Sequence, residues 1–144
     1  MRPMGFWIKE IDRRIEADFG RLLADEELTR RHWQILTTLA QGATPRADLD
    51  AALAPFAATV RPQLDELIHR GWASPLTAEP VELVESVESV AEAVRLTAAG
   101  RVVHDRVAGR VRAFRAHVTD GLSEQDYVTL VTLLERVAGN LTPA

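Results

Sequence analysis

Apolar residues recur every three or four positions along most of this 144-residue chain, and one segment breaks that spacing. The spacing is typical of amphipathic helices, because 3.6 residues complete a helical turn. Between residues 72 and 96, Pro75 and Pro80 exclude a continuous helix, and the valines of the segment favour extended structure. We therefore expect a mainly helical chain with one β-hairpin that carries a long loop. A helical turn over residues 85–92 is the alternative for part of that loop.

Six helices are expected around the hairpin. They span about residues 5–24, 29–41, 44–54, 59–70, 97–119 and 123–141. The expected N-caps are Thr29, Thr44, Thr97 and Ser123. Pro45 fits the first helical position after Thr44, where a backbone N–H has no partner anyway. Ser123 and Asp126 resemble a capping box in which Asp replaces Glu.

Short helices followed by a β-hairpin, as over residues 29–97, are the order of a winged helix-turn-helix. The remaining helices, in residues 1–28 and 98–144, are long and apolar on one side. A helix of about 23 residues is about 35 Å long, more than a compact monomer of this size easily covers. We expect residues 1–28 and 98–144 to form a dimerisation region and residues 29–97 to form the winged lobe. The alternative is a monomeric helical bundle.

Five short motifs, taken together and in order, resemble those of the MarR family of bacterial transcription regulators. They are Leu28-Thr29-x-x-His32-Trp33-x-Ile35-Leu36, Asp48-Leu49, the segment from Thr59 to Trp72, Leu96-Thr97-x-x-Gly100-Arg101, and Gly121-Leu122-Ser123. The resemblance covers nearly the whole chain. It implies an α+β fold, mainly α with a small β-hairpin, in which a winged helix-turn-helix is flanked by long N- and C-terminal dimerisation helices.

The resemblance also implies a function. The family's dimers lay the helix matched by residues 59–70 in the major groove of double-stranded DNA, with the hairpin at the minor groove. Such a homodimer recognises a pseudo-palindromic operator whose half-sites lie about one helical turn apart. Many relatives are repressors released from DNA by a small aromatic acid. The resemblance therefore implies a regulator with a small-molecule effector. We expect it to be cytoplasmic, because no segment fits a signal peptide or a membrane span, and we expect no cofactor.

Six residues are the candidates for DNA contact. They are Arg46, Thr59, Arg61, Gln63, Arg70 and Arg95. The family usually has a basic residue at the position of Pro62, so Arg61, one residue earlier, is expected to contact a guanine edge or a phosphate. Arg46 and Arg70 are expected at backbone phosphates, with the alternative that each is an ordinary surface arginine.

The hairpin segment is unusually acidic. Residues 73–97 contain five glutamates and one arginine, a net charge of −4, which equals the net charge of the whole chain. An acidic loop is repelled by DNA phosphates. This feature supports an alternative function, in which a dimer of the regulator fold has weak or lost DNA binding and contacts a basic protein partner through the acidic loop.

The remaining chemistry is sparse. The chain has no cysteine, which excludes disulfides and thiolate metal sites, and its four histidines lack metal-ligand spacing. No nucleophile or phosphate-loop motif suggests an enzyme. No segment is expected to be a signal peptide or to span a membrane. For an effector, the resemblance points to His32 and Trp33, with Arg13 as a partner for a carboxylate; the alternative is a core tryptophan and a surface arginine.

Overall fold

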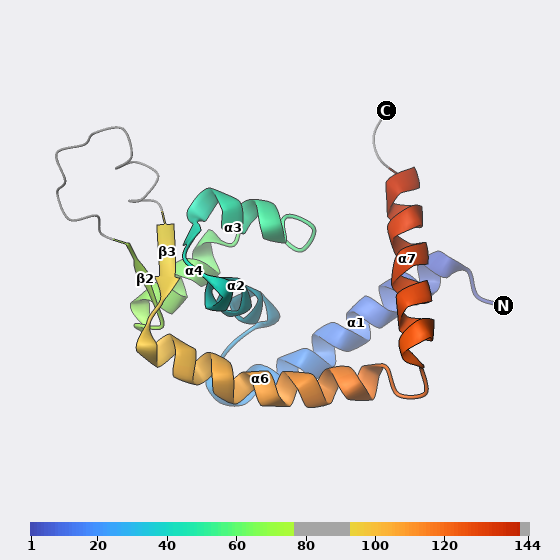
Figure 1. The fold of residues 1–144 in the computed structure, drawn as a ribbon, viewed down its shortest axis with the longest axis horizontal. Coiled ribbons are helices and arrows are strands. Elements are labelled where there is room, and N and C mark those ends of the chain that lie inside the picture. The colour runs from blue at the N-terminus through green and yellow to red at the C-terminus, as the bar shows by residue number, and fades with distance from the viewer. Residues whose placement is uncertain (77–92, 142–144) are drawn as a thin grey trace. The chain divides into compact units, whose positions relative to one another are not determined.

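The computed structural model describes residues 1–76 and 93–141 and is mostly helical, with one small antiparallel sheet (Figure 1). The helices are α1 (Met4–Leu23), the 3-10 helix η1 (Ala24–Glu26), α2 (Arg30–Gln41), α3 (Arg46–Leu53), α4 (Arg61–His69), α6 (Ala98–Val118) and α7 (Glu124–Asn140). The strands are β1 (Thr44–Pro45), β2 (Ala73–Pro75) and β3 (Ala93–Leu96). The chain divides into two compact units, Met1–Ala108 and Gly109–Ala144, and each is described by itself.

The sheet has three strands in the order β1-β3-β2, and both pairings are antiparallel. Thr44 lies opposite Val94, and Ala73 lies opposite Leu96. The expected hairpin is therefore present as β2 and β3. The tip of the hairpin, with its glutamates and the alternative helical turn over residues 85–92, lies outside the described residues.

The predictions for the start of α3 were wrong: Thr44 is not its N-cap, and Pro45 is not at its first helical position. Thr44 and Pro45 form the edge strand β1, and the N-cap of α3 is Pro45, which has no side-chain capping bond. The residue before a proline is biased towards extended structure, and Thr44 is β-branched, so this pair fits a strand. The pairing partner, Val94, lies fifty residues further along the chain, which local sequence cannot reveal.

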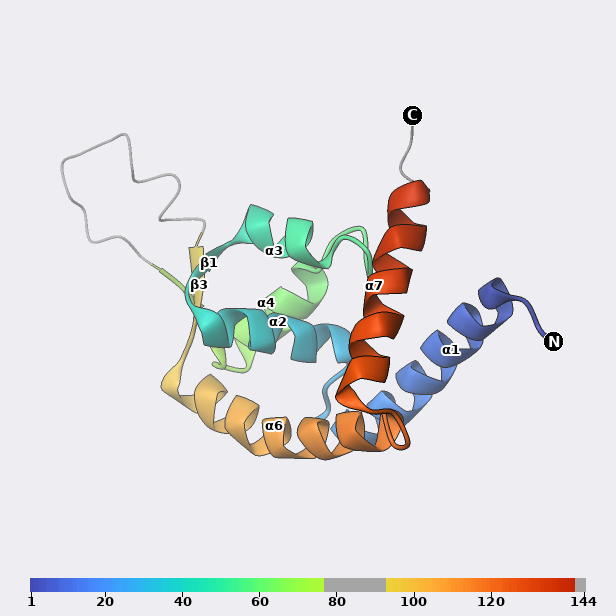
Figure 2. The ribbon, with the colours of Figure 1, turned by 45° about the vertical axis from the view of Figure 1, so that its right-hand side comes forward.

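The core of the first unit lies where α2, α3 and α4 meet the sheet (Figure 2). Its fully buried side chains include Ile35, Leu36, Leu39, Leu49, Leu64, Leu67 and Val94. On α4 only Leu64 and Leu67 are buried, three residues apart, so one face of this helix is fixed to the core and the opposite face is left outward.

Three of the predicted helix starts are confirmed. Thr29 caps α2 by accepting from the backbone N–H of His32, and Ser123 and Asp126 form a capping box at the start of α7. Before α6, the Thr97 hydroxyl oxygen accepts from the Gly100 N–H at 3.0 Å and its O–H donates to the Gly71 carbonyl at 2.7 Å. Thr97 thus ties the start of α6 to the turn that ends α4.

Gly100 is required where α6 begins. A Cβ atom built at this position would collide with the carbonyl oxygen of Trp72, a backbone atom that cannot move aside easily. The Trp72 carbonyl also accepts the N–H of Thr97 at 3.0 Å. The close approach of α6 to Trp72, three residues past the end of α4, therefore depends on the absence of a side chain at Gly100.

The second unit is dominated by α7, which buries none of its residues. Its exposed large apolar side chains are Tyr127, Val128, Leu130, Leu133 and Leu134. In the first unit, α1 likewise exposes Met4, Trp7, Ile8 and Ile11. Within the described ranges, no helix combines the length and the hydropathy that crossing a membrane requires.

Candidate nucleic-acid interface

The turn between α3 and α4 is held by the carboxylate of Asp50. Asp50 accepts from the Thr59 hydroxyl at 3.1 Å and from the Val60 N–H at 2.9 Å, and the Thr59 oxygen accepts from the Arg61 N–H at 3.2 Å. These bonds satisfy donors at the start of α4, where Val60 provides no side-chain cap. They also engage Thr59, a predicted DNA contact, in the turn itself.

The first turn of α4 presents Arg61 to solvent. Arg61 and Pro62 are exposed, whereas Leu64 behind them is buried. Pro62 fits this position because the first helical turn lacks partners for its N–H groups. Arg61 is therefore exposed at the first position of a helix that Leu64 and Leu67 anchor in the core. In helix-turn-helix proteins, residues at the N-terminal end of the recognition helix contact base edges.

Gln63, a further predicted contact, is half-buried, and its Oε1 atom is buried without a hydrogen-bond partner among the described residues. An unpaired buried carbonyl is costly, and this atom is one of only two such side-chain atoms in the described ranges. Asp65 and Glu66 are further exposed residues of α4, and their carboxylates contact Arg46 of α3 and His32 of α2.

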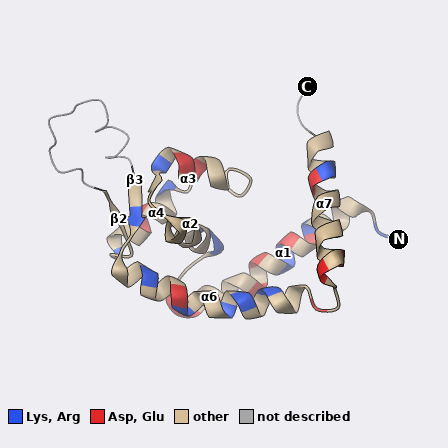
Figure 3. Ribbon diagram, viewed as in Figure 1, with Lys and Arg blue, Asp and Glu red and all other residues tan. Residues whose placement is uncertain are grey.

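Arg46 lies at the start of α3, and its guanidinium is 3.4 Å from the Asp65 carboxylate of α4. The pair is partly exposed, so its attraction is weak and a phosphate could compete for Arg46. Figure 3 shows that α3 carries basic and acidic stretches side by side. Arg46, which is predicted to contact a phosphate, therefore already has an intramolecular partner in Asp65.

The Arg70 side chain is engaged by other residues of the first unit. Its guanidinium donates to the carbonyl oxygens of Glu26 and Glu27 at 3.2 and 2.8 Å and lies 5.1 Å from the centre of the Trp72 ring. These contacts fasten the end of α4 to η1. Glu26 in turn accepts a bidentate pair of bonds from Arg106 of α6 at 2.7 and 2.8 Å, so η1 connects α4 with α6.

Arg95 is the exposed residue of β3, and its neighbours Val94 and Leu96 are buried. It lies opposite Ser74 of β2, at the base of the hairpin. This places it on the winged part of the lobe, apart from Arg61 in the chain and on a different element. The rest of the hairpin lies beyond the described residues.

The three predicted effector residues do not share partners. His32 is 4% exposed and bonded to Thr29 and Glu66, and Trp33 is 5% exposed and stacked on His104 of α6. Arg13 is exposed on α1, where it donates to Glu10 at 2.6 and 3.0 Å. His32 and Trp33 therefore contact α4 and α6, whereas Arg13 contacts a residue of its own helix, α1.

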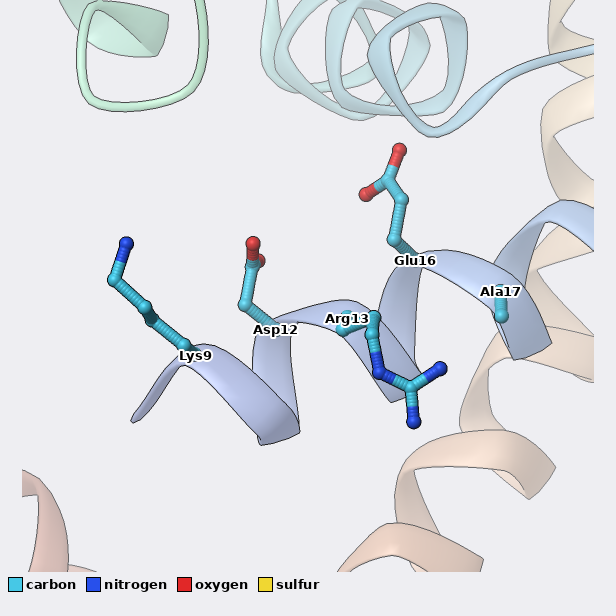
Figure 4. Close-up of a pocket in the computed structure, with 5 residues that line it drawn as sticks. All are labelled: Lys9, Asp12, Arg13, Glu16 and Ala17. Carbon is cyan, nitrogen blue, oxygen red and sulfur yellow. The ribbon is translucent and has the colours of Figure 1, made fainter. Parts of the chain in front are cut away.

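Arg13 borders an open depression along α1 with Lys9, Asp12, Glu16 and Ala17. Lys9, Asp12 and Glu16 point to one side of the helix and Arg13 points away from them (Figure 4).

Hydrogen bonds from Arg13 and Arg14 hold the pKa of Glu10 at about 2, well below its ordinary value of 4.5.

On the side of α1 that faces away from Arg13, Arg30 of α2 binds the carboxylates of Asp12 and Glu16 at 3.2 and 2.8 Å. These ion pairs join α1 to the start of α2. Because the partners are 14 and 18 residues apart, helical spacing gave no signal for them. No cluster of three metal-ligating side chains occurs among residues 1–76 and 93–141.

Comparison with known proteins gives a match by structure and not by sequence. No family model matches the chain, and no curated protein matches it. Many solved structures with high-probability matches are MarR-family regulators.

Three of them illustrate the likeness. A MarR-family regulator from Silicibacter pomeroyi is 20% identical, with a TM-score of 0.74, over 97% of this chain and 90% of its own. BpsR from Bordetella bronchiseptica, described with regulation of its DNA binding by 6-hydroxynicotinic acid, is 24% identical, with a TM-score of 0.76, over 95% of this chain and 94% of its own. A point mutant of MarR from E. coli, complexed with operator DNA, is 19% identical, with a TM-score of 0.75, over 94% of this chain and 93% of its own. The chain therefore has the winged-helix fold of these regulators.

Proposed function

We propose that this chain is a homodimeric, DNA-binding transcription regulator that acts as a repressor. The observation that carries the proposal is the placement of α4, with Leu64 and Leu67 buried in the core and Arg61 exposed in the first turn. The second helix of a helix-turn-helix enters the major groove, and its N-terminal residues contact base edges. The fold supports the same function, because one structural neighbour is complexed with operator DNA.

The six candidate residues differ in how exposed they are and in whether they already have a partner within the protein. Arg61 and Arg95 are exposed, and no side-chain partner is found for either among the described residues. Arg46 shares its guanidinium with Asp65, and Thr59, Gln63 and Arg70 are engaged or half-buried within the lobe. We assign base contact to Arg61, with phosphate contacts from Arg46 and Arg95 at the edges of the interface.

A second copy of this chain is the proposed partner of the terminal helices. The apolar faces of α1 and α7 leave side chains such as Trp7, Ile11, Leu130 and Leu134 more than two-fifths exposed. Exposed apolar patches mark interaction sites, and most homo-oligomers are symmetric dimers. A two-fold axis would present two copies of α4 to the two half-sites of a pseudo-palindrome.

Release by a small aromatic or anionic ligand completes the proposal. The regulation of BpsR by 6-hydroxynicotinic acid supports an effector of this class. We assign Arg13 to the ligand's carboxylate and the region of His32 and Trp33 to its ring. A ligand that binds the released arrangement better lowers operator affinity by that difference in affinity.

The acidic hairpin favours the second candidate function, an interaction dimer that contacts a basic protein. Residues 73–97 hold a charge of −4, which opposes approach to phosphates. This candidate predicts no specific duplex binding at any salt concentration. The regulator predicts a preferred sequence and an affinity that falls steeply as salt rises.

The experiment is a selection of random duplex DNA by the purified protein, followed by titration of the enriched duplex at two salt concentrations. Enrichment of a pseudo-palindrome with salt-dependent affinity is the expected result. A failure to enrich any sequence at low salt, repeated after removal of small molecules by unfolding and refolding, would reject the regulator in favour of the interaction dimer.

A further inference from the structure

His32 is a buried polar side chain that joins two helices. It stands at the third position of α2 and is 4% exposed. Its Nδ1 atom is 2.9 Å from the backbone nitrogen of Thr29, and its Nε2 atom is 2.6 Å from the Oε2 atom of Glu66 on α4. One imidazole ring thus contacts the start of α2 and the candidate recognition helix at the same time.

The partners determine where the ring carries its proton. A backbone N–H can only donate, so the Nδ1 atom that faces Thr29 must be an unprotonated acceptor. A neutral imidazole then carries its hydrogen on Nε2, where the carboxylate of Glu66 accepts it. Every polar group in this chain of contacts is satisfied by one tautomer.

This arrangement adds a function to the capping box. A capping box commonly has Glu or Gln at this position, which accepts from the N-cap N–H and completes the helix start. An acceptor alone would suffice for that purpose. The imidazole has, in addition, a donor on its far side, and this donor reaches a residue 34 positions away on α4.

We infer that His32 is a positioning residue for α4: as the neutral Nε2–H tautomer, it caps α2 through Nδ1 and fixes the rotation of α4 through Glu66. The inference rests on the proposed function and names the residue that sets how α4 meets DNA. Leu64 and Leu67 hold one side of the nine-residue helix to the core, but apolar contacts are not directional. The short bond to Glu66 is directional and charge-assisted.

Glu66 is well placed to transmit this restraint. It follows Asp65, the partner of Arg46, so neighbouring residues of α4 are bonded to α2 and to α3. A small rotation of α4 would break both bonds and would carry Arg61 along the groove. Misplacement of a contact residue by a fraction of a turn removes its hydrogen bonds to base edges.

The test separates capping from positioning with three variants. His32→Glu keeps an acceptor for the Thr29 N–H but places a carboxylate against Glu66. His32→Glu combined with Glu66→Gln restores a donor opposite the new carboxylate. His32→Gln offers both an acceptor and a donor and is the conservative control.

Affinity is measured for the selected duplex by fluorescence anisotropy, and folding is checked by thermal unfolding. We expect His32→Glu to lose about tenfold in affinity, the coupling typical of bonded neighbours, and the double variant to recover most of it. His32→Gln should bind like the parent protein. Parental affinity in His32→Glu would show that only the cap matters and would overturn the inference, as would a double variant that recovers nothing.

A spectroscopic measurement keeps the inference falsifiable if His32→Glu does not fold. The ring nitrogen resonances of His32 in the parent protein should show an unprotonated Nδ1 and a protonated Nε2, and Glu66→Ala should shift the Nε2 resonance. A proton on Nδ1, or an Nε2 resonance that ignores Glu66→Ala, contradicts the inference. This readout needs no DNA, so it distinguishes a wrong role for His32 from a wrong function for the chain.

Discussion

The indole ring of Trp33 on α2 stacks on the imidazole of His104 on α6, with the ring planes 8° apart and the centroids 5.1 Å apart. Trp33 is 5% exposed, so most of its surface is covered by protein. The contact joins the winged lobe to the first half of α6, within the unit Met1–Ala108. An effector placed at Trp33 would have to displace or extend this stack.

His104→Ala should lower the free energy of unfolding by about 1 kcal/mol, because a stacked pair contributes that much beyond its burial. The measurement is urea unfolding followed by the circular dichroism of the helices. His117→Ala, which alters an exposed histidine of the same helix, is the matched control. Equal losses in the two variants would show that the stack contributes nothing.

Gly100→Ala should destabilise the protein by about 1–3 kcal/mol, the usual cost of overpacking, because the added methyl group meets the Trp72 carbonyl. Gly109→Ala lies in the same helix, with nothing near its Cβ position, and should stabilise by about 0.4–1 kcal/mol. Thermal unfolding of both variants is the measurement. A Gly100→Ala protein that melts with or above the Gly109→Ala protein would show that the start of α6 is free to shift.

Arg61→Ala should weaken binding of the selected duplex by about 1–3 kcal/mol and should relax the preference at one base pair. The loss follows from the removal of a donor on the outward first turn of α4, and the melting temperature should not change. Arg110→Ala removes an exposed arginine of α6 and is the control for charge alone. Anisotropy titrations that give the two variants the same affinity would contradict the role of Arg61.

Leu130→Asp should convert the dimer to a monomer, because it places a charge in the apolar face of α7 that we assign to the partner. Thr132→Asp adds the same charge on the opposite side of the helix and should leave the dimer intact. Sedimentation velocity over a range of concentrations is the measurement. A parent protein that sediments as a monomer, or a Leu130→Asp protein that remains dimeric, would refute this interface.

The Glu10 carboxyl should titrate with a pKa of about 2 in the folded protein, because Arg13 and Arg14 donate to its charged form. Since this pKa lies below the unfolded value of 4.5, the pairing stabilises the fold above about pH 4.5 and is lost as the pH falls towards 2. The carboxyl carbon resonance of Glu10 provides the titration curve. In the variant with both Arg13→Ala and Arg14→Ala, the midpoint should return towards 4.5, and an unchanged midpoint would reject the cause.

The features that the sequence predicted are those set by neighbours in the chain. Thr29 and the pair Ser123 and Asp126 cap their helices as expected, because a cap is a contact across three residues. In both cases the information lay within four consecutive residues of the chain.

The features that the sequence did not predict depend on distant residues. Thr44 joins a strand because Val94 is available to pair with it. Arg70 faces the carbonyl groups of η1, and His32 meets Glu66, across 43 and 34 positions. No spacing rule connects such residues, so the sequence could not show which arginines are bonded within the protein and which stay exposed.

The sheet has a further consequence, which follows from its two outer strands. β1 ends in Pro45 and β2 ends in Pro75, and both flank the central strand β3. Proline has no N–H to donate, so a foreign strand that approached either edge would find its ladder interrupted. The lobe is thereby guarded against sheet-to-sheet aggregation, which is a useful safeguard for a chain whose helices α1 and α7 expose large apolar side chains.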